Sequence, residues 1–186
     1  MRNVHVAALG IALSLAAAVQ ASEIIIFNFA LTGAQEVPPN NSNAVGAARL
    51  EYYTETKRFD IDLMVFGIGL GDLRGVGPNL TPAHIHLAPP GVNGPIVIDL
   101  GYLSGGFKQD GLGIRLTVKD ALFGGQQGGV YSDPSANEAA LFAGNLYANV
   151  HTNAYPGGQI RGQIVPEPSV RVLVAALGVL AVLRRR

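Results

Sequence analysis

Hydrophobic and polar residues alternate along several short segments, and this pattern predicts an antiparallel β-structure. Side chains that repeat with a period of two lie on one face of a strand. In Arg58–Phe66, for example, Phe59 and Ile61 share one face, whereas Asp60 and Asp62 lie on the other. The expected strands are Glu23–Leu31, Ala47–Thr54, Arg58–Phe66, Ala83–Leu87, Ile96–Leu100, Ile114–Val118, Leu146–His151 and Gly158–Ile164.

One segment carries the signals of a helix. Asp133 precedes it as an N-cap, Pro134 occupies the first turn and Gly144 follows Ser135–Ala143 as a stop. Several short strands separated by turn residues, with one short helix, indicate an all-β sandwich or barrel.

The first 21 residues have the composition of a signal peptide. Arg2 precedes the apolar run Val6–Val19, and Val19-Gln20-Ala21 places small residues where a signal peptidase cuts. The alternative is a first transmembrane helix, but the run is short for a hydrocarbon core of about 30 Å. We therefore expect residues 1–21 to direct export to the cell envelope or beyond.

The last 22 residues contain a second apolar segment, which we expect to be helical and which has characteristic residues on both sides. A proline-rich break precedes Val170–Leu183, and an arginine cluster ends the chain. Residues 165–186 thereby resemble the PEP-CTERM sorting signal of Gram-negative bacteria. The resemblance implies an exosortase-type processing enzyme as partner and a transient inner-membrane anchor, with cleavage of the tail left open. An ordinary C-terminal anchor is the alternative, and it needs nearer 20 apolar residues than the 14 present. The motif residues are Pro166, Glu167, Pro168, Arg184, Arg185 and Arg186.

Charge and cysteine content exclude several classes of function. Five of the 13 basic residues but only one of the 13 acidic residues lie in the two ends, so Ser22–Val165 keeps 8 basic and 12 acidic residues. This net charge of −4 argues against nucleic acid, which requires basic patches. The absence of cysteine excludes disulfides, thiol catalysis and thiolate metal sites.

Three of the four histidines lie in two short strands of the body. His84 and His86 point to one side of Ala83–Leu87, opposite Ile85, and His151 lies opposite Val150 in the strand Leu146–His151. If the two strands are neighbours, one surface carries all three imidazoles.

A His-x-His strand with a distant third histidine is an arrangement that can hold one copper or zinc ion. Neutral imidazole binds both metals, and three ligands leave an open position. The alternative is structural, with His84, His86 and His151 hydrogen-bonded to neighbouring loops. Glu36 and Asp99 are conceivable oxygen ligands, although nothing in their spacing selects them.

No convincing catalytic constellation accompanies these histidines. A Gly-x-Ser-x-Gly nucleophile elbow is missing from the sequence. Asp60 and Asp62 lie about 7 Å apart on one strand face, but paired acids on a hairpin are more often solvated than catalytic. We therefore expect no enzymatic activity.

Five ordered motifs then identify a resemblance over about residues 28–164. They are Leu31–Pro39 (LTGAQEVPP), Thr81–His86 (TPAHIH), Gly91–Val97 (GVNGPIV), Tyr147–Thr152 (YANVHT) and Tyr155–Gly162 (YPGGQIRG). These segments resemble the CHRD domain, first described in chordin, although Gln159 stands where that family often has glutamate. The resemblance implies an immunoglobulin-like or superoxide-dismutase-like antiparallel β-sandwich over residues 22–164, without a settled activity. The three histidines outside the signal peptide are too few for the complete two-metal dismutase centre, and without cysteine its structural disulfide is excluded as well.

Three more residues of these motifs are candidate structural or ligand contacts: Glu36, Asn149 and Arg161. Asn149 shares the face of His151 on its strand. Arg161 has two interpretations, a clamp for a carboxylate or other anion, or a salt bridge to an acidic loop such as that of Glu36.

The sequence leaves two hypotheses. The first is an exported, non-enzymatic envelope or extracellular-matrix domain that binds a protein, a polysaccharide or itself. The second is a mononuclear copper or zinc protein with a structural or redox role at His84, His86 and His151.

Overall fold

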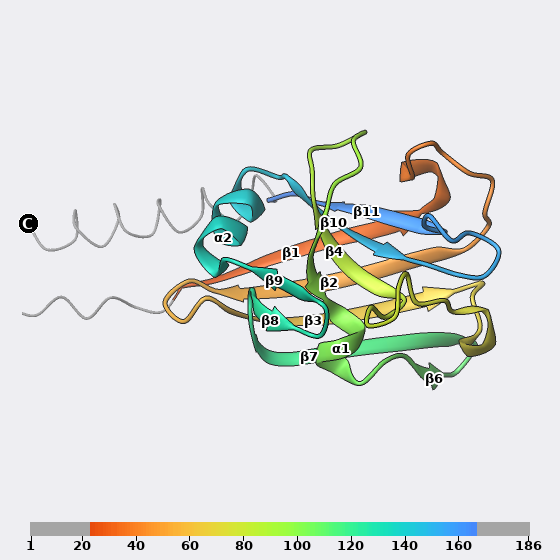
Figure 1. Ribbon diagram of the computed structural model, residues 1–186, viewed down its shortest axis with the longest axis horizontal. Coiled ribbons are helices and arrows are strands. Elements are labelled where there is room, and N and C mark those ends of the chain that lie inside the picture. Colours follow the sequence, from red (N-terminus) through yellow and green to blue (C-terminus); the bar gives the residue numbers. More distant parts are fainter. Residues whose placement is uncertain (1–22, 167–186) are drawn as a thin grey trace, which may run out of the picture.

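The computed structural model describes residues 23–166, which form a β-rich body with two short α-helices (Figure 1). The α-helices are α1 (Leu100–Ser104) and α2 (Pro134–Phe142), and two 3₁₀ turns are η1 (Gly33–Gln35) and η2 (Leu70–Asp72). The strands are β1 (Ile24–Thr32), β2 (Val45–Tyr53), β3 (Arg58–Phe66), β4 (Ala83–Leu87), β5 (Ile96–Asp99), β6 (Lys108–Asp110), β7 (Gly113–Leu122), β8 (Gly125–Gln127), β9 (Val130–Ser132), β10 (Leu146–Val150) and β11 (Ile160–Ile164).

Nine of these strands form one antiparallel sheet in the order β5-β4-β10-β11-β1-β2-β3-β7-β6, and β8 and β9 form a separate hairpin. The prediction of an all-β fold is confirmed. The expected strands Ala47–Thr54 and Arg58–Phe66 form as β2 and β3, which pair as a hairpin from Val45 opposite Phe66 to Tyr53 opposite Arg58.

The sheet curls so that apolar residues from its two halves enclose one core. Alternation buries Leu50 on β2, Ile61 on β3 and Leu116 on β7, while Ile85 and Ala148 contribute from β4 and β10. All five belong to the same buried cluster. In Figure 1, β4 and β10 accordingly lie in front of β2 and β3.

The helices correct one part of the prediction. Helix α2 begins as expected, with the Asp133 carboxylate accepting a hydrogen bond from the Ala136 backbone N–H. The expectation of one short helix is nevertheless wrong, because α1 also forms. Asp99 caps α1 and Gly105 ends it in the left-handed conformation with φ of 73°. Five residues are too few to produce a helical hydrophobic period, so the expected strand Ile96–Leu100 stops at Asp99.

Loops cover the second face of β4 and β10, opposite the core. The His151 N–H donates to the Pro82 carbonyl at 2.8 Å, and the Arg74 N–H donates to the His151 carbonyl at 3.1 Å. Polar side chains on this face are therefore enclosed between the sheet and the loops, where their unpaired atoms require partners.

The predicted apolar helices at both termini fall outside the described residues. These are the signal peptide (1–21) and nearly all of the sorting signal, of which Val165 and Pro166 alone are described. Within 23–166, no helix is long and apolar enough to cross a membrane.

Candidate metal centre

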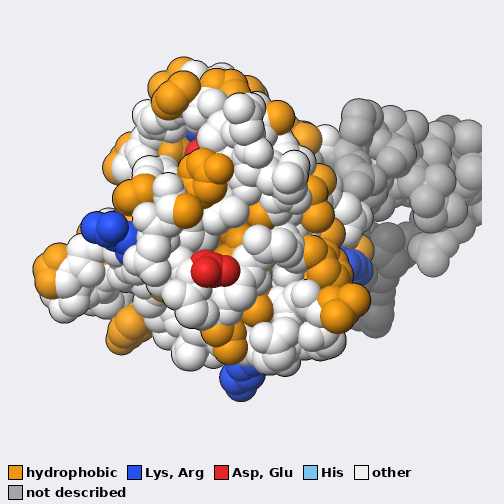
Figure 2. Space-filling view, turned by 90° about the vertical axis from the view of Figure 1, so that its right-hand side faces the viewer, with side chains coloured by type: hydrophobic (Ala, Val, Ile, Leu, Met, Phe, Trp, Pro, Cys, Tyr) orange, Lys and Arg blue, Asp and Glu red, His pale blue; other side chains and the backbone are white. Residues whose placement is uncertain are grey.

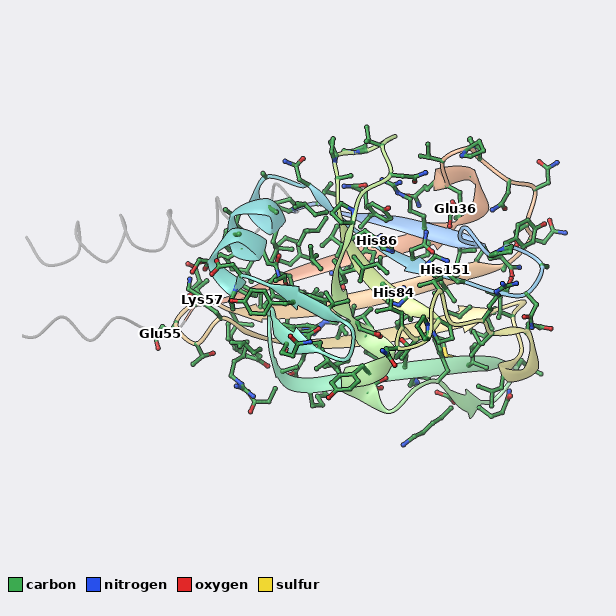
Figure 3. The ribbon with its side chains drawn as sticks, in the orientation of Figure 1. Glu36, Glu55, Lys57, His84, His86 and His151 are labelled. Carbon is green, nitrogen blue, oxygen red and sulfur yellow. The ribbon has the colours of Figure 1, made fainter. Side chains whose placement is uncertain are left out.

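The pairing of β4 with β10 brings the three predicted histidines together (Figure 3). His84 lies directly opposite Asn149 and His86 lies opposite Tyr147, while His151 follows the last residue of β10. Because residues i and i+2 of a strand share a face, all three imidazoles project to the loop-covered side. One ring nitrogen of each lies within 4.8 Å of the other two.

All three imidazoles are enclosed. His84, His86 and His151 expose 0 %, 8 % and 4 % of their surface. The ring centroid of His84 lies 5.8 Å from that of His86 and 5.3 Å from that of His151. The expectation that these histidines occupy polar faces therefore needs a refinement, because their face is buried by loops.

Two of the histidines have the same hydrogen-bond pattern. The Nδ1 atoms of His86 and His151 each lie 3.0 Å from a loop carbonyl, that of Gly94 and that of Pro156 respectively. A carbonyl only accepts, so Nδ1 must carry the proton in each ring. The two Nε2 atoms are left with a lone pair, buried and without a hydrogen-bond partner among the described residues. Metal-ligating histidines commonly have this arrangement.

A buried carboxylate, that of Asp99, lies near His84 without forming a hydrogen bond to it. The Nε2 atom of His84 lies 3.9 Å from Oδ2 of Asp99, which is longer than a hydrogen bond but within electrostatic reach. The backbone N–H groups of Thr81 and Tyr102 each donate to the Asp99 carboxylate at 3.1 Å, and the Thr81 hydroxyl donates as well. Neither ring nitrogen of His84 has a hydrogen-bond partner among the described residues, so either one can present its lone pair to an ion.

Burial keeps the three imidazoles neutral. It lowers the pKa of His84 to about 3 and that of His86 to about 4, and it also lowers the pKa of His151. The positive charge that each protonated histidine would carry adds to the effect on His84. Neutral imidazole is the form that binds metal.

The cluster fits one metal ion with nitrogen ligands. Bonds of about 2.0–2.1 Å place the nitrogens of a tetrahedral zinc site about 3.4 Å apart. The observed limit of 4.8 Å is larger than that spacing, so the ring nitrogens would have to move closer together to bind one ion. The unpartnered Nε2 atoms supply an independent reason for an ion, because buried polar atoms are nearly always paired.

The remaining predicted residues line the same face next to the cluster. Tyr147 stacks on His86 with ring centroids 4.8 Å apart, and the Arg161 guanidinium carbon lies 3.4 Å from the Tyr147 ring centroid. The Asn149 amide donates to both Glu36 oxygens at 3.1 Å. Burial raises the pKa of Glu36 to about 7, although Arg161 and the bond from Asn149 act against that rise.

One expected ion pair is missing, and two acidic residues form ion pairs that the sequence did not predict. The expected salt bridge between Arg161 and Glu36 is not among the pairs within 4.0 Å in residues 23–166, since Arg161 bonds to neutral oxygens instead. Asp60 and Asp62, which we expected to be solvated, pair across the sheet with Lys119 at 2.8 Å and Arg115 at 2.6 Å.

Sequence reasoning missed the groups that surround the histidines. Gly94 and Pro156 act through backbone carbonyls, for which no side-chain signal exists. Asp99 carried a signal as a helix cap, but the sequence suggested it only as an oxygen ligand. Tyr147 lay on the correct strand face, yet its stacking on His86 depends on the pairing register of β4 and β10.

Comparison with known proteins gives one match. Residues 27–164 match the CHRD domain. No curated protein and no solved structure matches the chain.

Proposed function

This chain belongs to the CHRD domain family, and we propose that it binds one transition-metal ion, zinc or copper, through His84, His86 and His151. The observation that carries the proposal is the set of lone-pair nitrogens left without hydrogen-bond partners inside a buried cluster. Bound zinc or copper would cross-link β4 to the end of β10, and an open fourth position would permit ligand exchange or, with copper, redox chemistry.

Metal-dependent thermal unfolding of the EDTA-treated full chain tests this proposal. Zn²⁺ or Cu²⁺ at about 100 times its dissociation constant should stabilise the fold by about 2.7 kcal/mol. Mg²⁺ should not, because it prefers oxygen ligands. His86→Gln should remove the stabilisation, whereas Asp133→Asn, which alters the cap of α2 outside the cluster, should retain it. Equal stabilisation by Mg²⁺, or an unchanged response of His86→Gln, would contradict the proposal.

The metal site is proposed to belong to an exported domain of the cell envelope or extracellular matrix. The signal-peptide pattern of residues 1–21 and the PEP-CTERM pattern of residues 165–186 support this location. An exosortase-type enzyme is the proposed processing partner, and a matrix protein or polysaccharide the proposed binding partner. Deletion of residues 165–186 should change where the protein accumulates, and unchanged localisation would contradict sorting by the tail.

We also propose that the curled sheet is an immunoglobulin-like sandwich of the superoxide-dismutase type. Its antiparallel strands and its core shared between β2–β3–β7 and β4–β10 support that assignment. The three-histidine site, with one metal ion, would then be a smaller counterpart of a two-metal centre.

A further inference from the structure

A separate hollow opens beside the histidine cluster, between the loop after β1 and the loop after β4. It has a volume of about 400 Å³ and is walled by Val37, Pro39 and Pro90, with Glu36 and Arg161 among its lining residues. Near the top of Figure 2, a few basic and acidic atoms show between hydrophobic and other atoms. Small-molecule sites are typically concave and mostly apolar, of about 300–1,000 Å³, with a few polar groups.

The cation of this hollow, Arg161, forms no ion pair within 4.0 Å with an acidic side chain among the described residues, although Glu36 lies within electrostatic range of it. Arg161 is 1 % exposed, and its guanidinium donates to Asn93 Oδ1 at 3.3 Å, to the Pro89 carbonyl at 3.3 Å and to Gln163 Oε1 at 3.2 Å. All three acceptors are neutral, and all three bonds are long for charge-assisted ones. The Tyr147 ring covers one face of the guanidinium. Burial of an unpaired charge is costly, so a complementary anion would stabilise the site.

Glu36 only partly supplies that anion. Its two oxygens accept from the Asn149 amide and form no ion pair within 4.0 Å with Arg161 among the described residues. Burial raises the pKa of Glu36 to about 7, so much of the protein carries a neutral Glu36 near neutral pH. In that form the carboxyl group can donate a hydrogen bond to an incoming anion.

We propose that this hollow binds a small organic monocarboxylate. Its carboxylate would meet Arg161 at the floor, and its apolar body would lie against Pro39 and Pro90. A guanidinium matches the planar carboxylate geometry, whereas a phosphate dianion would place excess negative charge beside Glu36. This inference goes beyond metal binding and does not depend on it.

Calorimetric titration of the EDTA-treated full chain tests the proposal, with benzoate as the probe. Benzyl alcohol provides the same ring without charge, and inorganic phosphate provides a different anion. Benzoate should bind at one site, at least tenfold more tightly than benzyl alcohol or phosphate. At pH 8, where Glu36 is ionised and repels an anion, Glu36→Gln should tighten benzoate binding severalfold while it keeps an oxygen acceptor for Asn149.

Two further variants separate the hollow from general effects on folding. Arg161→Lys keeps the charge but loses the planar fork, so benzoate should bind at least tenfold more weakly. Ala34→Phe fills the hollow from an exposed position and should abolish binding, whereas Ala47→Phe, at an exposed alanine of β2, should leave it unchanged. Equal affinities for benzoate and benzyl alcohol, or full binding by Ala34→Phe, would overturn the proposal. Because the metal is absent, neither result bears on the histidine site.

Discussion

At the scale of single residues, Asp99 has two separable roles. Its carboxylate caps α1 and lies 3.9 Å from His84 Nε2. Asp99→Asn keeps an oxygen for the cap but loses the negative charge near His84. We predict a loss of about 10–100-fold in zinc affinity, as for other partners of metal-ligating histidines.

Calorimetric titration with Zn²⁺ measures that loss. Asp133→Asn is the matched control, because Asp133 caps α2 and belongs to neither the cluster nor its hydrogen bonds. Unchanged affinity in Asp99→Asn would show that the Asp99 carboxylate does not orient His84.

Gly158 is the residue that closes the loop over Asn149 and Glu36. Its φ is 133°, and an added Cβ would lie 2.5 Å from Asn149 Nδ2 and 2.6 Å from Glu36 Oε1. Gly158→Ala should therefore lower the free energy of unfolding by about 2 kcal/mol, measured by urea denaturation. The adjacent Gly157 has nothing within 4 Å of an added Cβ, so Gly157→Ala should change stability little. Equal effects of the two substitutions would contradict this account.

At the scale of elements, β4 joins the core to the candidate metal centre. Ile85 is fully buried on the core face, between His84 and His86 on the opposite face. Ile85→Ala should cost about 2–5 kcal/mol in unfolding free energy, the range for large-to-small substitutions in a core. Leu87→Ala is the matched control on the same strand, because Leu87 is 38 % exposed and should cost far less. Similar losses in urea denaturation would show that β4 does not pack as described.

The same strand shows how much of the candidate metal centre could be predicted from the sequence. Alternation in Ala83–Leu87 and Leu146–His151 correctly places the three histidines on one side of each strand. The alternation of residues cannot show which strands pair. The three histidines could be placed in one cluster only because β4 and β10 are neighbours in the sheet. The alternation also cannot show that loops bury the histidine face, because those contacts run through the carbonyls of Gly94 and Pro156.

At the scale of the whole molecule, the buried cluster makes stability depend on pH when no metal is bound. His84 and His86 have pKa values of about 3 and about 4 in the fold, below their ordinary value of 6.5. Below pH 6.5 the unfolded chain binds more protons at these two sites, so the fold loses stability as the pH falls. Glu36 acts in the opposite sense between 4.5 and about 7, because its pKa is raised.

The stability lost through the two histidines is larger than the stability gained through the one carboxyl group. The metal-free chain should therefore lose on the order of 2 kcal/mol of unfolding free energy between pH 6.5 and pH 4.5. Urea denaturation at the two pH values measures the loss. Glu36→Gln should make it larger, because the opposing proton uptake disappears. A stability that stays constant or rises toward pH 4.5 would contradict the burial of neutral histidines.

The long elements of the fold could be predicted from the sequence, whereas the short elements and some side-chain contacts could not. The hydrophobic alternation of Arg58–Phe66 and the cap at Asp133 predicted a long strand and a helix that both form. The brief elements α1 and β6 escaped prediction, because five or fewer residues hold no full hydrophobic period. The missing salt bridge of Arg161 was also unpredictable, since it depends on how the loop of Glu36 folds against β10.

His84, His86 and His151 together should bind one metal ion. X-ray absorption at the zinc edge of the full chain, loaded with one equivalent of Zn²⁺, tests it most directly. Three imidazole nitrogens should lie at about 2.0–2.1 Å from zinc, and His151→Gln should reduce them to two. An all-oxygen shell, or a spectrum that His151→Gln leaves unchanged, would contradict metal binding by the three histidines.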